Sequence, residues 1–512
     1  MKSTLILVLL LLVSPIMAAD HTSDAVMPLF TFGETGASLS TCFAIGNGQY
    51  LLTTADNVME NIGTSTKHNI QSAVAISPWT GDIYRARIDK VDGSANLALL
   101  KLDKPGLPAA AFAKSPSTIP FATLGQLLNE NETAGGRWPT IMYSYLRGKK
   151  DGRTSYLLTQ WNGTNAFITE AKGRRWLFLK DVKPQDKAPG GGPVVRDGEG
   201  VVGIYISRFI IEGGGKSDEQ RLCVPLTETL KFLESAGLKK DDLYNPSEPT
   251  FEKADDAEIA FQFAWRAVSN VIGANWENAL TDAKTFAEAR PKSAEAQLLN
   301  GLALAGAGKT EEAVKSFDAA VKLDTQLADA YLSRGIAQGV LGKKKESEQD
   351  LRKVMELNPN DIHGPMWLSR LLSSDENKRD EAVQLAEQAV KISPYSPMAL
   401  LNLGSTLALK GNHERAISEL KHALEIAPNY GDARAALASE YRASGKTDEA
   451  EKEYRVLVKA EPKNPAALLE LAGFLAEQGK KDEAKQLISQ ALELNPSEAL
   501  KNAAEELKKK TE

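Results

Sequence analysis

Residues 397–430 have the sequence PMALLNLGSTLALKGNHERAISELKHALEIAPNY, and copies of this pattern fill the second half of the chain. The copies are 34 residues long, with one step of 35, and they close at Pro291, Thr325, Pro359, Pro394, Pro428, Pro462 and Pro496. A repeating unit of this length is one supersecondary element that cannot bury its apolar face alone. The period therefore predicts a stacked superhelix whose function is binding.

Each copy is predicted to form two helices. In residues 397–430, apolar side chains recur at helical spacing until Gly411 and Asn412 interrupt them, and a second apolar run follows. Gly404 and Ala416 are small, which lets the paired helices approach closely. Pro428 cannot continue the second helix, so the unit ends there.

This pattern resembles the tetratricopeptide repeat, whose large-residue position holds Phe317, Leu351, Leu420 and Tyr454. The resemblance covers residues 259–498 in seven registers, which are 260–293, 294–327, 328–361, 363–396, 397–430, 431–464 and 465–498. The first and fourth copies are degenerate, with Ala267 and Arg370 at the small-residue position. Residues 499–512 are predicted to be a polar capping helix, over 499–510, and a tail; an open-ended stack needs such a cap for solubility.

The resemblance implies a concave groove, lined by the first helix of each repeat, that binds a protein or peptide partner. Positions 2, 5, 9 and 12 of each register would face it, and their apolar residues include Leu298, Leu302, Leu332, Ile336, Trp367, Leu371, Leu401 and Leu469. Trp367 and Leu371 are the strongest candidates for peptide contact, although core packing is the alternative for any apolar residue at this spacing. Position 6 lacks the basic residues of a carboxylate clamp, which favours an extended or helical apolar peptide over a C-terminal carboxylate.

Residues 1–19 are predicted to be a cleavable signal peptide, with Lys2 at its start, a short apolar core and Ala18-Ala19 at the cleavage site. The apolar core is too short for a stable membrane anchor. We therefore expect export to the periplasm or secretion, with no stable membrane insertion.

Composition excludes several classes of function. The net charge of −6 is evenly spread, so the basic footprint of a nucleic-acid-binding protein is missing. Histidine and cysteine are scarce and dispersed, so we expect no metal site, and we expect no cofactor because no phosphate-binding motif fits. Cys42 and Cys223 form either one disulfide or two buried thiols.

Residues 20–240 differ in kind from the repeats. Short β-rich runs alternate with turn residues, which is typical of an all-β domain, and the length suits two small barrels. The predicted strands are Cys42–Ile45, Tyr50–Thr53, Ala73–Ile76, Leu97–Lys101, Thr154–Thr159, Trp176–Phe178 and Val201–Tyr205.

Three segments of this half, at residues 43–58, 94–102 and 188–204, resemble in order and spacing a trypsin-like serine protease of the HtrA type. The resemblance implies a double β-barrel and a catalytic triad. At the triad positions, however, the chain carries Asp56 for histidine, Asn96 for aspartate and Gly190 for serine. A Ser-His-Asp mechanism needs a nucleophile, a base and a carboxylate that orients the base, so all three roles are unfilled.

The expected activity is therefore that of a pseudo-protease. The turn around Ala188, Gly190 and Gly191 can still point amide groups into an oxyanion-hole-like nest, which binds but does not cut. An active serine-type endopeptidase with non-standard residues is the alternative, and the lack of a side chain at Gly190 argues against it.

The linker between the halves is predicted at residues 241–258, which are polar and contain two prolines. The halves are expected to fold separately, while the first repeat helix, with Phe261 and Trp265, is expected to pack on the β-domain or the linker. The favoured function is an exported interaction scaffold. A structural part of an envelope or secretion assembly is a further possibility that the sequence does not separate from it.

Overall fold

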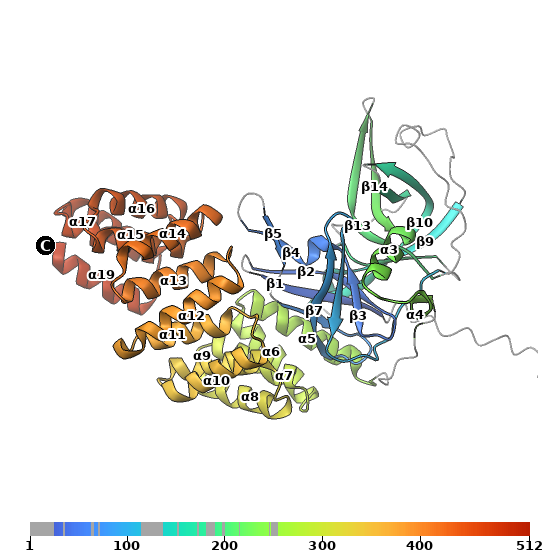
Figure 1. Ribbon diagram of the computed structural model, residues 1–512, viewed down its shortest axis with the longest axis horizontal. Coiled ribbons are helices and arrows are strands. Elements are labelled where there is room, and N and C mark those ends of the chain that lie inside the picture. The colour runs from blue at the N-terminus through green and yellow to red at the C-terminus, as the bar shows by residue number, and fades with distance from the viewer. Residues whose placement is uncertain are drawn as a thin grey trace, which may run out of the picture. The chain divides into compact units, whose positions relative to one another are not determined.

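The computed structural model describes residues 25–511, except for gaps at 34–35, 63–65, 70–71, 114–136, 151–152, 172–173, 181–189, 197–199, 214–215, 245 and 247–253. The predicted signal peptide and Ala188 lie outside the described residues. The described residues form two compact units, and the main division between them falls between Leu323 and Asp324. Figure 1 labels the helices and strands of both units. Each unit is described below by itself.

The first unit begins with a closed β-barrel, whose strand order is β1-β2-β3-β8-β7-β6. These strands are β1 (Val26–Gly33), β2 (Gly36–Ile45), β3 (Tyr50–Thr53), β6 (Ser72–Ile76), β7 (Ile83–Asp92) and β8 (Leu97–Leu102). All neighbours are antiparallel, and β1 closes the barrel by pairing Leu29 with Ala75 of β6. One buried cluster contains Met27, Leu29, Cys42 and Leu51. Strands β4 (Met59–Ile62) and β5 (Thr66–Asn69) form a separate small sheet.

A second closed barrel follows, with the order β10-β11-β14-β13-β12-β9. Its strands are β9 (Arg137–Lys150), β10 (Arg153–Ala171), β11 (Arg174–Lys180), β12 (Pro193–Arg196), β13 (Gly200–Gly213) and β14 (Lys216–Pro225). Helices α3 (Leu226–Ser235) and α4 (Lys240–Tyr244) come next. All seven predicted strands fall within observed strands, because period-2 runs bounded by turn residues are a strong local signal.

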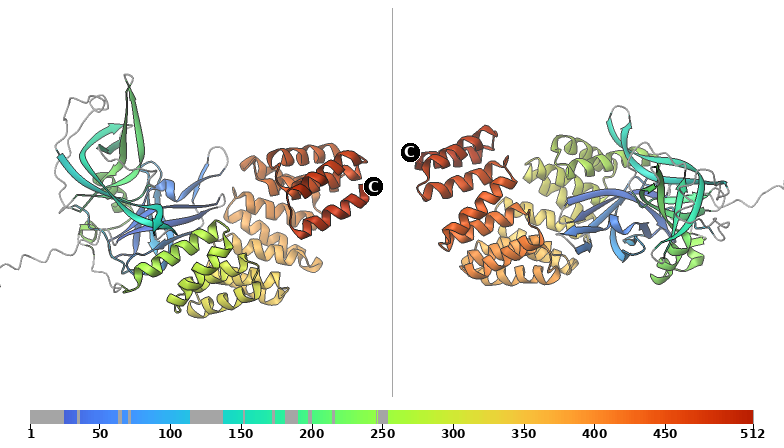
Figure 2. Two further views of the ribbon diagram at one scale, coloured as in Figure 1. Left: turned by 180° about the vertical axis from the view of Figure 1, so that it is seen from behind. Right: turned by 90° about the horizontal axis from the view of Figure 1, so that it is seen from above.

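Seven helix pairs form the repeats. Their first helices are α5 (Ala257–Ile272), α7 (Ala294–Gly306), α9 (Ala328–Val340), α11 (His363–Ser373), α13 (Pro397–Leu409), α15 (Gly431–Ala443) and α17 (Pro465–Glu477). Their second helices are α6 (Trp276–Ala289), α8 (Thr310–Leu323), α10 (Lys344–Leu357), α12 (Arg379–Ile392), α14 (His413–Ile426), α16 (Thr447–Ala460) and α18 (Lys481–Glu493). Helix α19 (Glu498–Thr511) packs on α17 and α18 and covers the end of the array (Figure 2).

The residue types explain these helix boundaries. The hydroxyl of Ser396 accepts a hydrogen bond from the amide of Ala399, and Pro397 holds the first position of α13, where a missing N–H costs nothing. The close approach of α13 and α14 needs glycine at 404, since a Cβ atom there would lie 2.7 Å from Cγ of Leu420. Glycine at the small-residue position of this repeat thus allows the close packing of its two helices, as the sequence pattern predicted.

The packing does not divide at the predicted linker. Helix α5 buries Phe261 and Trp265 in a core that also contains side chains of the β-barrels, so the first two repeats belong to the first unit. The expectation that the first repeat helix packs on the β-domain is confirmed. The expected separation at 241–258 is corrected to the position after Leu323, because the aromatic face of α5 needs the barrel to cover it.

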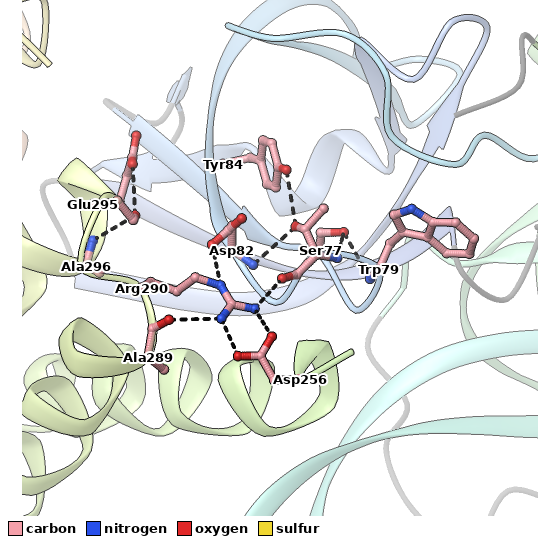
Figure 3. Close-up of polar contacts among 11 residues, drawn as sticks. Ser77, Trp79, Asp82, Tyr84, Asp256, Ala289, Arg290, Glu295 and Ala296 are labelled. Atoms are coloured by element: carbon pink, nitrogen blue, oxygen red, sulfur yellow. Dashed lines mark hydrogen bonds and ion pairs between the residues drawn. The ribbon is translucent and has the colours of Figure 1, made fainter. Parts of the chain in front are cut away.

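Arg290 is the polar centre of this packing (Figure 3). Its guanidinium donates at 3.0 Å to Asp82 and at 2.8 Å to the carbonyl of Thr80, both in the β6–β7 turn, and it holds both carboxylate oxygens of Asp256 at 2.7 and 2.8 Å. The guanidinium keeps the pKa of Asp256 below its usual value, whereas burial raises the pKa of Asp82. Residues of the barrel, of the α5 N-terminus and of the α6 C-terminus are thereby tied together.

Candidate functional site

Two surfaces carry the predicted functional residues. The first is the centre of the double barrel, where the three triad-equivalent positions were expected. Asp56 lies in a short 3₁₀ turn, and its backbone N–H donates to Oδ1 of Asn96 at 3.1 Å, while Nδ2 of Asn96 donates back to Oδ2 of Asp56 at 3.0 Å. Asn96 has a φ of 53°, at the end of a turn that Asp92 closes by accepting from the amides of Ser94 and Ala95. The histidine-equivalent position, Asp56, and the aspartate-equivalent position, Asn96, are thus hydrogen-bonded to each other as a carboxylate–amide pair.

Gly190 joins this centre through Asn57. The carbonyl oxygen of Gly190 accepts from Nδ2 of Asn57 at 3.0 Å and from the amide of Thr41 at 3.3 Å. Nδ2 of Asn57 also donates to the Thr53 hydroxyl at 2.8 Å, and that hydroxyl donates to the carbonyl of Thr41. Thr53 is fully buried and its hydroxyl already makes both of these hydrogen bonds, so it does not offer a nucleophile. Sequence reasoning missed Asn57; its only signal was a polar residue next to a substituted triad position.

The space at Gly190 is closed. A Cβ atom there would overlap the carbonyl oxygen of Ile206 and lie 3.1 Å from its carbonyl carbon. Gly191 has a φ of 103°, which excludes most side chains, and its N–H donates to the carbonyl of Tyr205 at 2.8 Å. This corrects the predicted nest at Gly191: its amide is already bonded, so it is not available to an oxyanion.

Replacing Asn57 tests this network. We expect Asn57→Ala to lower the free energy of unfolding by about 2 kcal/mol, because two hydrogen bonds disappear and the Thr53 hydroxyl loses a donor. The adjacent Asp56→Ala removes an exposed carboxylate and should change the free energy of unfolding by about 0.5 kcal/mol or less. Urea denaturation of the full chain measures both. Equal effects of the two substitutions would contradict this account of the centre.

Neither cysteine forms a disulfide and both are buried, so the thiol alternative holds. Burial raises the pKa of the Cys42 thiol, which keeps it neutral and unreactive. Among the described residues, no group of three or more His, Cys, Asp and Glu side chains is arranged to hold a metal ion. In the same part of the chain, no helix has the length and apolar character needed to cross a membrane.

The second surface is formed by the first helices of the second unit. Helix α9 contacts α11, α11 contacts α13, and α13 contacts α15, whereas successive second helices in residues 324–511 touch at most marginally. In a curved stack, the helices that approach each other most closely lie on the inside of the curve. The first helices α9, α11, α13 and α15 therefore line the concave side.

The predicted groove residues divide into three groups. Leu298 and Leu302 lie on α7, in the first unit, so they do not share a described surface with the others. Leu469 is 5% exposed, which makes it a core residue. The remaining candidates are partly exposed side chains of the second unit: Leu332, Ile336, Trp367, Leu371 and Leu401.

Trp367 is both packed and accessible. It contacts the buried cluster that contains Leu351 and Leu368, together with Leu332 and Leu371. The guanidinium of Arg370 lies over its ring, 5.4 Å from the centroid. Arg370, the residue that makes the fourth repeat degenerate, thus stacks on Trp367.

The second helices carry a different chemistry. Ion pairs connect successive repeats: Arg352 with Glu381 at 2.6 Å, Arg415 with Glu387 at 2.7 Å, and Arg455 with Glu483 at 2.6 Å. The guanidinium of Arg455 holds the pKa of Glu483 below its usual range. Each exposed pair is worth only a few tenths of a kcal/mol, so these pairs contribute little to the stability of the array.

Models of the tetratricopeptide repeat match most of the second half of the chain. The matched residues are 273–328, 328–361, 373–440, 407–460 and 441–507. These ranges omit all of α5 and nearly all of α11, which belong to the two copies that the sequence marks as degenerate.

Several solved structures are similar to the repeat part of the chain. A thermophilic TPR protein of Thermus thermophilus is 23% identical, with 36% of this chain and 99% of that chain covered and a TM-score of 0.34. A tetratricopeptide repeat protein from Parabacteroides merdae is 16% identical, with 49% of this chain and 97% of that chain covered and a TM-score of 0.41. Yeast Tom70 is 22% identical, with 49% of this chain and 54% of that chain covered and a TM-score of 0.41.

Proposed function

We propose that this chain, whose residues 273–507 are tetratricopeptide repeats, is an exported scaffold that binds a peptide segment of a partner protein through the first helices of its second unit. The observation that carries the proposal is the row of partly exposed apolar side chains on α9, α11 and α13, with Trp367 at its centre. Tightly packed aromatic residues of this kind commonly dominate the energy of peptide recognition.

The β-part of the proposal is a trypsin-like double barrel that no longer cuts. Two closed six-stranded barrels followed by a helix agree with that architecture, and Asp56 and Asn96 pair across 40 residues of sequence as two triad positions would. With no side chain at Gly190 and no room for one, the centre has no nucleophile to offer. Its hydrogen bonds instead hold residues 190–191 against the first barrel.

The exported location rests on residues 1–19 alone. When the full chain is expressed in a bacterial host, intact-mass analysis of the purified protein should show removal of these residues. A mature protein that retains Met1 to Ala19 would contradict export through a cleaved signal.

Selection of displayed random 12-residue peptides on the immobilised full chain tests the binding function. We expect apolar peptides to be enriched, and their binding to be reproduced by residues 324–511 and lost in a chain that ends at Leu323. Enrichment on the truncated chain, or failure to enrich any peptide, would contradict binding by the second unit.

A further inference from the structure

The first unit shows how an occupant covers the groove positions of a repeat. Phe261, Ala264 and Val268 hold positions 2, 5 and 9 of the first register, and all three are buried in the core that includes side chains of the β-barrels. The turn between β6 and β7 lies directly on this helix, since a Cβ atom at Gly81 would be 2.7 Å from Cβ of Ala260. The groove face of α5 is therefore filled by a segment of the chain itself.

The occupant also matches the charges at the border of this covered face. Arg290, which follows α6, pairs with Asp82 of the β6–β7 turn at 3.0 Å (Figure 3). Glu295, at position 2 of the second register, lies 3.6 Å from Arg85 of β7. A charge that loses water beside an apolar contact costs free energy unless it is paired. An occupant of these repeats therefore has to supply the opposite charge.

The apolar face of the second unit presents a charge that the chain does not match. Helices α9, α11 and α13 contain two arginines and no lysine. Arg334 donates to both carboxylate oxygens of Asp350, at 2.8 and 2.7 Å. Arg370 is exposed and lies over the ring of Trp367, and within residues 324–511 its side chain has neither an ion pair nor a hydrogen bond. Its positive charge is therefore available to a partner.

The position over Trp367 prepares Arg370 for a carboxylate. A guanidinium that stacks on an aromatic ring keeps N–H groups at its edge, and these can donate two parallel hydrogen bonds to one carboxylate. The stack also restricts a long, flexible side chain before binding, which lowers the entropy lost when a partner orders it. Arg370 follows Trp367 by one helical turn and directly precedes Leu371, so the carboxylate would lie beside apolar side chains of the partner.

We propose that the bound segment carries an aspartate or glutamate that contacts Arg370, next to apolar side chains that contact Trp367 and Leu371. This inference rests on the proposed function and names the chemical class of its partner. The carboxylate belongs to a side chain within the segment, because position 6 of these registers lacks the basic residues that would clamp a C-terminal carboxylate. A segment with a basic residue at this place would bring like charges together and bind more weakly.

Peptide selection on two forms of the full chain tests the proposal. On the wild type, the enriched apolar peptides should contain aspartate or glutamate beside the apolar residues. On the Arg370→Glu variant, apolar enrichment should remain, while the acidic preference should change to lysine or arginine. Apolar peptides without an acidic preference on the wild type, or the same acidic preference on the variant, would overturn this inference and leave the proposed function standing. No enriched peptide at all would overturn both.

A double-mutant cycle on one selected peptide, synthesised with an amidated C-terminus, gives the second readout. Arg370→Gln should weaken binding of the acidic peptide by about fivefold or more, and should bind a version with the corresponding amide residue about as the wild type does. Arg415→Gln is the matched control, because that arginine lies on the second helix α14 and is already paired with Glu387. An equal loss for both peptides would show that Arg370 acts only through its stack on Trp367, which would overturn the proposal. Affinity of the acidic peptide should also fall with added salt.

Discussion

A chain that ends at residue 240 should fail to form a stable double barrel, whereas a chain that ends at Leu323 should fold. The shorter chain lacks α5 to α8 and all of α4 after Lys240, with the buried Leu243. The barrel surface that covers Phe261 and Trp265 would therefore be exposed to water, and Asp82 would lose Arg290. We expect the shorter chain to aggregate or to melt at least ~10 °C below the longer one, since exposing this much apolar area costs several kcal/mol. Circular dichroism melting of the two chains measures the difference. Equal melting temperatures would contradict the position of the boundary.

A point substitution isolates the polar part of this packing. Arg290 is largely buried and pairs with Asp82 and Asp256, so Arg290→Ala leaves Asp82 partly buried and uncompensated. We expect a loss of about 3 kcal/mol in the free energy of unfolding of the first unit. Lys284→Ala is the control on the same helix, where an exposed pair with Glu288 should contribute less than about 0.5 kcal/mol.

Gly190→Ser should damage the fold and should not restore proteolysis. The new Cβ atom would overlap the carbonyl oxygen of Ile206, so the backbone must shift, at a cost of about 3 kcal/mol or more. The new hydroxyl would also lack a base, since Asp56 is bonded to Asn96. Even Asp56→His/Asn96→Asp/Gly190→Ser, which supplies all three side chains, meets the same overlap.

Gly93→Ser is the matched control, because the nearest atom to its Cβ would be Sδ of Met59 at 3.9 Å. Thermal unfolding compares the two variants, and a fluorophosphonate probe with unfolded casein detects activity. Labelling of the wild type, or a Gly190→Ser variant that melts normally and turns over casein, would refute the closed centre.

The sequence predicts much of this fold because its strongest signals are local and periodic. The 34-residue spacing requires the same two helices in each copy, and alternating β-rich runs between turn residues identify the strands. The pairing of Asp56 with Asn96 follows from motif order as well. Even the degenerate copies, marked by Ala267 and Arg370, coincide with gaps in the matched ranges.

Features that depend on distant packing were not predictable in this way. Arg290 and Asp82 are 208 residues apart, and nothing in either neighbourhood indicates the other. The overlap at Gly190 depends on the backbone of Ile206, since glycine alone does not reveal whether a side chain would fit. Leu469 occupies a groove position of its register but is buried, because it packs in a cluster that also contains Leu437 and Tyr441 of the preceding repeat.

The central claim is that the face around Trp367 binds peptide, and one titration tests it most directly. Fluorescence anisotropy of a selected peptide against the full chain should show that Trp367→Ala weakens binding by roughly 30-fold, or about 2 kcal/mol, at a temperature where the variant remains folded. Val456→Ala, on the second helix α16, should leave the affinity unchanged. Unchanged affinity of Trp367→Ala, with a lowered melting temperature, would make Trp367 a core residue and contradict the claim.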